Sequence, residues 1–338
     1  MADRAHLIAA FLTAQGWAGA DRYPLPGDAS FRRYVRLQDK HRSALLMDAP
    51  PPLESVQPFV RLARHLRSLG LSAPAVYGED LAHGLLLIED FGEETFTRLL
   101  AGGVDEESLY ALALDVLIDL HRKPTAQAIP KGLAPYDAAR LLEEALLFLD
   151  WYLPAVGAPV SDEVRGHFIR AWLGTFPLLG GQRPALVLRD YHVDNLMRLT
   201  DRTGIAACGL LDFQDALAGP AVYDVMSLLE DARRDIPEAL KAEMLERYLS
   251  AFDALDRAAF EAAFAVLGAQ RHAKVIGIFT RLHRRDGKQG YLPHIPRVWR
   301  MLERSLAHPV LGAVAAWFER HVPAEKRMIP PTDTMRQP

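Results

Sequence analysis

Hydrophobic and polar positions follow two different periods along this chain, and the change of period divides it into two parts. Between residues 23 and 91, apolar and polar residues alternate in short runs, which is the pattern of β-strands. From residue 106 onward, apolar residues recur every three or four positions, which is the spacing of one helix face. The predicted strands of the first part are 27–37, 43–47, 76–79 and 84–91.

One segment of this first part has helical spacing, in addition to a first amphipathic helix at the N-terminus. Between residues 56 and 69 the apolar residues that share one helical face are Phe59, Leu62, Ala63, Leu66 and Leu69. Gly70 follows at once and Pro74 lies just beyond, as expected where a helix ends. We therefore expect a helix that packs on a small antiparallel sheet.

The second part is expected to be mostly helical, with two short β-type runs in its middle. The predicted helices are 109–121, 137–152, 162–176, 222–233, 237–252, 257–279 and 297–307. The β-type runs are 185–188 and 205–211. Between them an apolar pattern resumes at Leu196 and Met197, and the polar segment 200–204 is expected to be a hairpin turn that leads into the second run. Because such a turn joins antiparallel strands, the polar groups after the two runs are expected to project from one sheet edge.

These patterns predict an α+β fold with a small, mainly antiparallel β N-lobe and a larger, mainly α C-lobe. The N-terminal lobe is expected over 1–91 and the C-terminal lobe over 92–328, with a hinge at Gly92. Residues 329–338 are rich in proline and polar groups and are expected to form a tail. A nucleotide can bind near the junction of two such lobes.

Three polar residues stand beside the two β-type runs at a spacing that suits phosphoryl transfer. Asp190 begins the loop after the first run, Asn195 lies five residues on, and Asp212 follows the second run. Moving a γ-phosphoryl group requires a carboxylate near the attacking hydroxyl and oxygen ligands for Mg²⁺. We interpret Asp190 as the base, and Asn195 and Asp212 as the metal ligands; the Asp-x-x-x-x-Asn spacing is that of a kinase catalytic loop.

Other interpretations of the same residues stay open. An Asp-x-x-x-x-Asn pair alone is typical of a solvated loop, and an Asp-Phe dipeptide alone does not indicate a function. A phosphatase or phosphodiesterase would use Asp190, His192 and Asp212 as metal ligands, but a two-metal site needs more His and Asp residues at ligand spacing. A nucleotide-binding regulator without activity is the third alternative, although it would have no use for a base and two metal ligands.

Composition limits the possible partners. The 338 residues and 50% hydrophobic content are typical of an ordered protein, and the 39 basic and 43 acidic side chains give 39 − 43 = −4 without a long run of one sign. We therefore expect no nucleic-acid, membrane or obligate protein partner. The single Cys208 is expected to be a buried hydrophobe, and the short apolar run near the N-terminus is too brief for a signal sequence, so a cytoplasmic location is expected.

Several blocks of sequence, in one order, resemble the aminoglycoside phosphotransferase family, and most closely its anomeric N-acetylmuramate/N-acetylglucosamine kinases. The match runs over most of the chain. The blocks that carry it are Gly27-Asp-Ala-Ser-Phe-Arg-Arg-Tyr34, Met47-Asp-Ala-Pro-Pro51, Arg189-Asp-Tyr-His-Val-Asp-Asn195, Leu211-Asp-Phe-Gln-Asp-Ala216, Gly219-Pro220, Tyr223-Asp224 and Arg285-Asp-Gly-Lys288.

The resemblance implies a protein-kinase-like fold and an ATP- and Mg²⁺-dependent enzyme. It implies that the lobe 1–91 binds the nucleotide and that the lobe 92–328 is catalytic and binds the sugar. It implies phosphorylation of the anomeric C1 hydroxyl of N-acetylmuramate and N-acetylglucosamine, a small-molecule amino sugar, in the recycling of cell-wall sugars. Another small-molecule hydroxyl kinase of the same family, or a nucleotide-binding pseudokinase, is the alternative.

The family pattern is incomplete in the first lobe. In a kinase, a lysine of the third strand and a glutamate of the following helix position the α- and β-phosphates. Both are absent here, because the strand ends in Leu45-Leu-Met47-Asp48 and residues 56–69 contain no acid. We expect another cation to replace the lysine, either Arg32 or Arg33. The residues expected to bind the nucleotide are Ser30, Phe31, Arg32, Arg33 and Glu89.

Further candidates are expected around the sugar and behind the catalytic loop. For the sugar they are Asp194, Glu143, Arg271, Lys274 and Arg281, with ordinary solvated side chains as the alternative. His192 is expected to brace the loop by hydrogen bonding, or else to be a solvated loop histidine. Asp224 resembles the acid that supports the catalytic loop in the family, and its alternative is a charge that complements the dipole of a helix.

Overall fold

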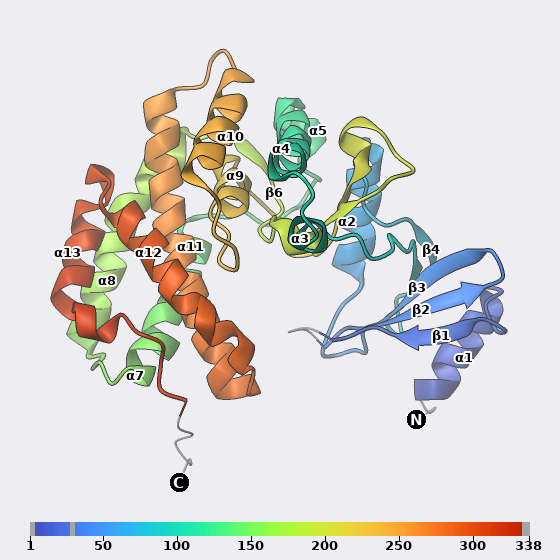
Figure 1. Ribbon diagram of the computed structural model, residues 1–338. Helices are drawn as coiled ribbons and strands as arrows, with labels where there is room; N and C mark the ends of the chain where they lie inside the picture. The colour runs from blue at the N-terminus through green and yellow to red at the C-terminus, as the bar shows by residue number, and fades with distance from the viewer. Residues whose placement is uncertain (1–3, 28–30, 333–338) are drawn as a thin grey trace, which may run out of the picture. The chain divides into compact units, whose positions relative to one another are not determined.

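Figure 1 shows the computed structural model, which describes residues 4–27 and 31–332. The chain folds into two compact units. Unit 1 comprises Met1–Leu120 and Asp190–Ala216, and unit 2 comprises His121–Arg189 and Leu217–Pro338. The antiparallel sheet and the predominance of helices confirm the predicted α+β fold class. The predicted lobe boundary at residue 91 stays a prediction.

Unit 1 contains a five-stranded antiparallel sheet in the order β1-β2-β3-β5-β4. The strands are β1 (Asp21–Pro24), β2 (Arg33–Asp39), β3 (Arg42–Asp48), β4 (Val76–Asp80) and β5 (Leu85–Ile88). A two-residue turn joins β2 to β3, and Lys40 adopts the positive φ of 54° that such turns require. The predicted strand 27–37 begins later, at Arg33, while residues 28–30 lie outside the described part of the chain.

Alternation along these strands places one set of side chains against helix α1 (Arg4–Ala14). The residues that form this buried cluster are Phe11, Leu12, Trp17, Leu37, Ala44, Leu46, Leu85 and Leu87. The register pairs Leu46 with Leu87 and Leu37 with Ala44, so the apolar residues of neighbouring strands lie opposite one another.

Helix α2 (Gln57–Ser68) confirms the predicted packing helix of unit 1. Its buried side chains include the predicted Phe59, Leu62, Ala63 and Leu66. Gly70 has a φ of +85°, a conformation that suits glycine after a helix end. The ring of Phe59 stacks on that of Phe213 with centroids 5.1 Å apart, which joins α2 to the segment that carries Asp212.

The remaining elements of unit 1 are α3 (Phe96–Ala101), α4 (Glu106–Arg122), β7 (Leu196–Arg198) and β8 (Cys208–Leu210). Strands β7 and β8 form the predicted antiparallel hairpin, although its second strand starts only at Cys208, which is buried as expected. Residues 204–207 form a 3₁₀ turn instead.

The prediction that both β-type runs end at one sheet edge is wrong. The first run becomes β6 (Pro184–Val187), which pairs with β9 (Leu217–Pro220) and forms a separate two-stranded sheet. Residues 217–220 pair with the backbone N–H and C=O groups of β6, so β6 does not pair with the β7–β8 hairpin. Asn195 and Asp212 still flank the same end of that hairpin, because Leu196 pairs with Leu210.

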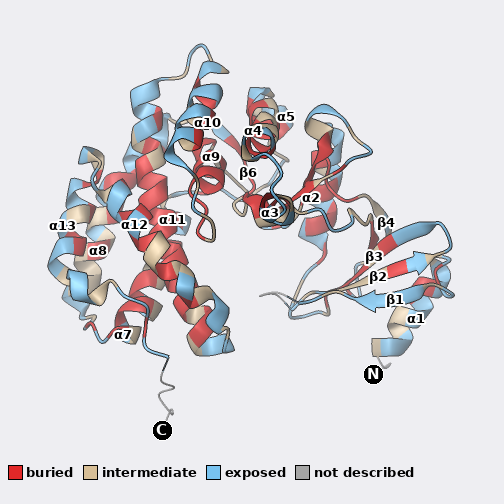
Figure 2. Ribbon diagram, in the orientation of Figure 1, coloured by how far each residue is buried: buried red, intermediate tan, exposed pale blue. Residues whose placement is uncertain are grey.

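Unit 2 is built around the long helix α11 (Arg257–Asp286), which contacts α6, α9 and α12. Figure 2 shows that much of α11 is buried. The other helices of the unit are α5 (Thr125–Ala128), α6 (Ala138–Leu147), α7 (Leu153–Ala155), α8 (Asp162–Thr175), α9 (Val222–Leu229), α10 (Glu238–Ser250), α12 (Ile295–Leu306) and α13 (Gly312–His321).

Several helix ends differ from the prediction for local reasons. Helix α11 continues past the predicted residue 279 because the first left-handed residue that can cap it is Gly287, with a φ of +69°. Helix α9 ends at Leu229, and α6 passes into a π-helical turn at Phe148–Tyr152. Helix α13 was not predicted. Within the described ranges, none of the helices combines the length and the apolar character needed to cross a membrane.

Candidate active site

The loop after β6 brings together Asp190 and Asn195, the two residues of the Asp-x-x-x-x-Asn motif. Residues Val193–Asn195 form a 3₁₀ turn, and the Asn195 N–H donates to the carbonyl of His192 at 2.9 Å. The side-chain Nδ2 of Asn195 donates to the main-chain carbonyl of Asp190, also at 2.9 Å. This bond fixes the amide, so its carbonyl oxygen is the atom left for a ligand.

His192 lies behind the same amide and is buried. Its Nε2 is 3.3 Å from Asn195 Nδ2, and because an amide nitrogen only donates, this Nε2 acts as the acceptor. The ring proton is therefore assigned to Nδ1, which lies 4.0 Å from a carboxylate oxygen of Asp194. This geometry is what the predicted bracing role of His192 requires.

Asp212 follows β8 in an unusual backbone conformation. Its φ is +57°, which is uncommon for a residue other than glycine and is frequent at functional sites. The buried ring of Phe213 anchors the segment on α2, and Gln214 Nε2 donates to Asp212 Oδ1 at 2.7 Å. The carboxylate side chain stays 48% exposed, so one side of it is open to a ligand.

The charges around Asp212 favour a bound cation. Partial desolvation and the negative charge of Asp190 raise the pKa of the Asp212 carboxyl, and Asp215 adds to the effect. Gln214 and Arg32 act in the opposite direction. A divalent cation would relieve the repulsion between the carboxylates, and the oxygens of Asp212 and Asn195 are ligands that suit Mg²⁺.

The protein would supply only part of the coordination shell of such an ion. Among the residues the structure describes, no group of three or more His, Cys, Asp or Glu side chains is placed to hold a metal. A magnesium site that uses few protein ligands completes its shell with water and phosphate oxygens, so two oxygen ligands fit that kind of site.

Arg32 is the cation that the structure places beside Asp212. Its guanidinium lies 3.8 Å from Asp212 Oδ1 and 3.2 Å from Glu54 Oε2, and the side chain is only 10% exposed. Arg33, the other candidate, is exposed. Sequence reasoning missed Glu54; its signal was its position just before α2, since the helix itself contains no acid.

The remaining predicted nucleotide positions divide into three cases. Phe31 is exposed, and its N–H donates to Glu54 Oε1 at 3.4 Å. Glu89 accepts hydrogen bonds from the Ala75 N–H at 3.0 Å and from Arg202. Its carboxylate is thus engaged within unit 1, and contact with a nucleotide stays a prediction. Ser30 lies outside the described residues.

Asp224 holds the main chain immediately before Asp190. It is fully buried on α9, and its two carboxylate oxygens accept the N–H groups of Leu188 at 2.6 Å and Arg189 at 2.9 Å. Arg189 has a φ of +69°. A carboxylate that accepts two successive N–H groups stabilises this left-handed conformation, which costs about 1–3 kcal/mol elsewhere.

A buried carboxylate, Glu144 of α6, holds the side chain of Arg189. Glu144 also pairs with Lys274 Nζ at 3.0 Å and accepts the hydroxyl of Tyr136. We call Glu144, Arg189, Lys274 and Tyr136 the Glu144 cluster. Burial by itself would raise the pKa of Glu144, but Lys274 and Arg189 outweigh it and keep that pKa below its ordinary value.

Arg271 completes the support of the same main-chain segment. Its Nη1 donates to the carbonyl of Arg189 at 3.1 Å and to the hydroxyl of Tyr223 at 3.1 Å. Arg271 and Lys274 are both buried, on α11, so two of the cations predicted to bind the sugar are instead paired within unit 2. Contact of either residue with a sugar stays a prediction.

The other three sugar candidates occupy different settings. Glu143 is exposed and pairs with Arg140 at 2.7 Å, whereas its neighbour Glu144 is the buried acid. Asp194 accepts the hydroxyl of Thr97. Arg281 is partly buried on α11, where burial and the neighbouring charge of Arg285 lower its pKa. Their roles also stay predictions.

The chain is similar to known phosphotransferases in sequence and to solved kinase structures in fold. The profile described as "Phosphotransferase enzyme family" matches residues 22–261. A protein of Caulobacter vibrioides named N-acetylmuramate/N-acetylglucosamine kinase is 36% identical, over 96% of this chain and 98% of its own length. A protein of the same name from Pseudomonas aeruginosa is 38% identical over 87% of each chain.

Among solved structures, a choline/ethanolamine kinase family protein from Mesorhizobium loti is similar in fold. The TM-score is 0.62, and the similarity covers 94% of this chain and all of the other. Only 13% of the aligned residues are identical, so this likeness concerns the fold alone.

Proposed function

We propose that this chain, which belongs to the phosphotransferase enzyme family, is an ATP-dependent kinase that phosphorylates the C1 hydroxyl of N-acetylmuramate and N-acetylglucosamine. The observation that carries the chemistry is the pair formed by Asp190 and Asp212, with Asn195 fixed beside them. The substrate follows from the names of the relatives, which match most of the chain. A cytoplasmic location is part of the proposal.

In the proposed reaction, the sugar hydroxyl oxygen attacks the γ-phosphorus of ATP. The bond between that phosphorus and the β–γ bridging oxygen breaks, and ADP leaves with the bond's electron pair. Asp190 orients the hydroxyl and receives its proton. The rigid main chain before Asp190, held by Asp224 and Arg271, limits the positions that this carboxylate can take.

Asn195 and Asp212 would hold Mg²⁺. The ion would supply positive charge that offsets the negative charge developing during transfer. Asp212 is suited to the task because its carboxylate is half exposed and already lies in a field of negative charge.

We further propose that Arg32 and Glu54 replace the lysine and glutamate that position the α- and β-phosphates in other kinases. The observation behind this is their ion pair of 3.2 Å, directly beside Asp212. Glu54 holds the guanidinium beside Asp212, as the helix glutamate holds the lysine in other kinases, and a guanidinium suits paired contacts with phosphate oxygens. Arg32 and Glu54 would thus provide the same positive and negative charges as the lysine and glutamate of other kinases.

The acceptor is best tested with sugars that differ only at C1. With ATP and Mg²⁺, N-acetylglucosamine and N-acetylmuramate should each yield a phosphorylated product, whereas the methyl glycosides of the same sugars should be inert because their C1 oxygen is blocked. Phosphorylation of a methyl glycoside, or efficient transfer to kanamycin, would place the acceptor hydroxyl elsewhere without removing the kinase chemistry.

A further inference from the structure

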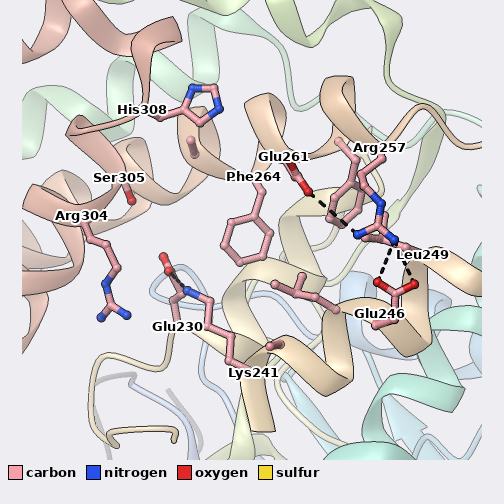
Figure 3. Close-up of a pocket in the computed structure, with 14 residues that line it drawn as sticks. Glu230, Lys241, Glu246, Leu249, Arg257, Glu261, Phe264, Arg304, Ser305 and His308 are labelled. Carbon is pink, nitrogen blue, oxygen red and sulfur yellow. Dashed lines mark hydrogen bonds and ion pairs between the residues drawn. The ribbon is translucent and has the colours of Figure 1, made fainter. Parts of the chain in front are cut away.

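Unit 2 contains a cavity of about 420 Å³ that shares no residue with the candidate active site. Helices α10, α11 and α12 enclose it, together with Glu230 just after α9. Figure 3 shows Arg304 and Lys241 on either side of Glu230, with Phe264 facing the same space. Cavities of this size hold small organic ligands.

An ion pair between Lys241 and Glu230 forms the floor of this cavity. The side chain of Glu230 is 5% exposed and that of Lys241 is 13% exposed, so the lysine is the more exposed partner of the pair. One carboxylate oxygen of Glu230 pairs with Lys241, and the other lies 3.3 Å from the buried His272 Nε2. The ammonium has three N–H donors and uses one for Glu230, so donors remain for a ligand.

The other polar groups of the cavity reinforce this bias toward donors. His308 Nδ1 accepts the Val310 N–H at 3.2 Å, so the ring proton lies on Nε2, which is a further donor. Arg304 is half exposed and pairs through Nη1 with Glu238.

The acids on the opposite side of the cavity are already engaged by the protein. Arg257 donates to both carboxylate oxygens of Glu246, at 2.9 and 2.7 Å, and lies 4.0 Å from Glu261. Lys241 and Arg304 each hold one acid, Glu230 and Glu238, and have further N–H groups, whereas both carboxylate oxygens of Glu246 accept from Arg257. A ligand that supplies negatively charged oxygen is what this imbalance favours.

An apolar wall adjoins these donors. Phe264 lies with its ring centroid 5.2 Å from Lys241 Nζ, and Leu249 and Phe260 extend the wall. A ligand with an anionic group beside Lys241 and a ring on Phe264 would satisfy both halves of the cavity.

We propose that this cavity is a binding site for a small organic anion, a phosphate ester or a carboxylate that carries a ring. The site is separate from the proposed function and does not depend on it. Its occupant would nevertheless touch the helix that holds Arg189, the residue before Asp190 in the sequence, because α11 carries Phe264 on the cavity, His272 against Glu230, Arg271 on the carbonyl of Arg189 and Lys274 on Glu144. This makes the cavity suited to an effector.

The probe is phenyl phosphate, titrated calorimetrically into the whole protein with ADP present at saturation so that the candidate active site is filled. We expect saturable binding with a Kd in the millimolar range or below. Phenol, which lacks the charge, and inorganic phosphate, which lacks the ring, should each bind at least about tenfold more weakly. Benzoate, a sugar 1-phosphate and a nucleoside monophosphate then distinguish the natural sources of the anion.

Two matched arginines locate the probe. Arg304→Met should weaken phenyl phosphate by about tenfold or more, whereas Arg257→Met, which removes an already satisfied cation, should leave the Kd within about twofold. The double substitution Glu230→Gln with Lys241→Met removes the ion pair without leaving a buried charge, and it should abolish binding. The proposal is overturned if phenyl phosphate does not bind, or if it binds equally well to Arg304→Met and to this double variant.

Discussion

Asp190 and Asp212 are two carboxylates that the loop geometry assigns to different tasks. Asp190 follows a main chain fixed by Asp224, whereas Asp212 has a half-exposed side chain beside Arg32. Desolvation and the negative charge of Asp190 together raise the pKa of Asp212. A base needs a fixed position and a metal ligand needs an open face, and each residue has the feature that its proposed role requires.

Asp190→Asn tests the role of the base. The change removes the proton acceptor and almost no volume, so we expect turnover to fall by about 10²–10⁴ while ADP affinity and folding stay the same. Turnover and ADP binding are measured on the same preparation. Asp201→Asn, in the exposed turn between β7 and β8, is the matched control and should keep full turnover. Wild-type turnover in Asp190→Asn would remove Asp190 from the mechanism.

Asp212→Asn tests the repulsion at the metal site through stability. Because the pKa of Asp212 is raised in the folded protein, the folded state binds this proton first as the pH falls, so ionisation of Asp212 costs stability above that pKa and not below it. Without metal or nucleotide, Asp212→Asn should therefore be more stable than the wild type at pH 7. Denaturant unfolding at a series of pH values should show this gain shrinking as the pH falls through the raised pKa. A gain that is the same at every pH would contradict a raised pKa at Asp212.

Arg32→Met and Arg33→Met separate the two candidate phosphate-binding cations. Arg32 lies beside Asp212 and Glu54, whereas Arg33 is exposed on the next position. We expect Arg32→Met to lower kcat/KM for ATP by an amount equivalent to about 1.5–3 kcal/mol of transition-state binding. This is the contribution of a hydrogen bond to a charged group. Arg33→Met should stay within about 0.5 kcal/mol of the wild type. Equal losses in the two variants would show that Arg32 has no special role.

At the scale of elements, β6, α6 and α11 meet at Arg189. Helix α6 supplies Glu144 for its side chain, α11 supplies Arg271 for its carbonyl, and β6 leads directly into it. Elements far apart in the sequence thus determine the conformation of the residue before Asp190. Such over-determination is what allows a non-glycine residue to keep a positive φ.

Glu144→Gln should disturb this junction strongly. It leaves Lys274 and Arg189 without their shared buried carboxylate, so we expect a loss of about 3–5 kcal/mol in the free energy of unfolding, together with lower turnover. Adding Lys274→Met should restore part of that stability. Glu143→Gln, one residue away but exposed, should change neither quantity. Chemical denaturation and steady-state kinetics on the four proteins decide the matter, and equal effects at the two glutamates would refute the role of the Glu144 cluster.

Sequence patterns predicted elements well where the signal was local. The face of α2 and the β7–β8 hairpin follow from spacing and turn residues alone. The pairing of β6 with β9 did not, because it joins runs that are distant in the sequence and short. The end of α11 was missed because polar residues continue the helix on its exposed side until Gly287.

Only part of the candidate site could be predicted from the sequence. The loop residues Asp190, Asn195 and Asp212 could be recognised because phosphoryl transfer prescribes their types and spacing. The Arg32–Glu54 pair and the Glu144 cluster could not, because pairing across a fold leaves no periodic trace in the sequence. Lys274 illustrates this limit: a lysine on a helix is usually solvated, yet here it is buried against a carboxylate.

At the scale of the whole molecule, the proposal joins a kinase site to a chain whose relatives are named for two amino sugars. The central claim is that the protein transfers phosphate from ATP to C1 of such a sugar with the help of Asp190. N-acetylglucosamine labelled with ¹³C at C1 allows one measurement to test the donor, the acceptor atom and the base together.

That measurement is the NMR spectrum of the product after incubation with ATP, Mg²⁺ and the labelled sugar. We expect the wild type to give a C1 signal split by a directly attached phosphate, and Asp190→Asn to give almost none under the same conditions. A product whose phosphate is attached at another carbon, no product at all from the wild type, or an equal yield from Asp190→Asn would contradict the account.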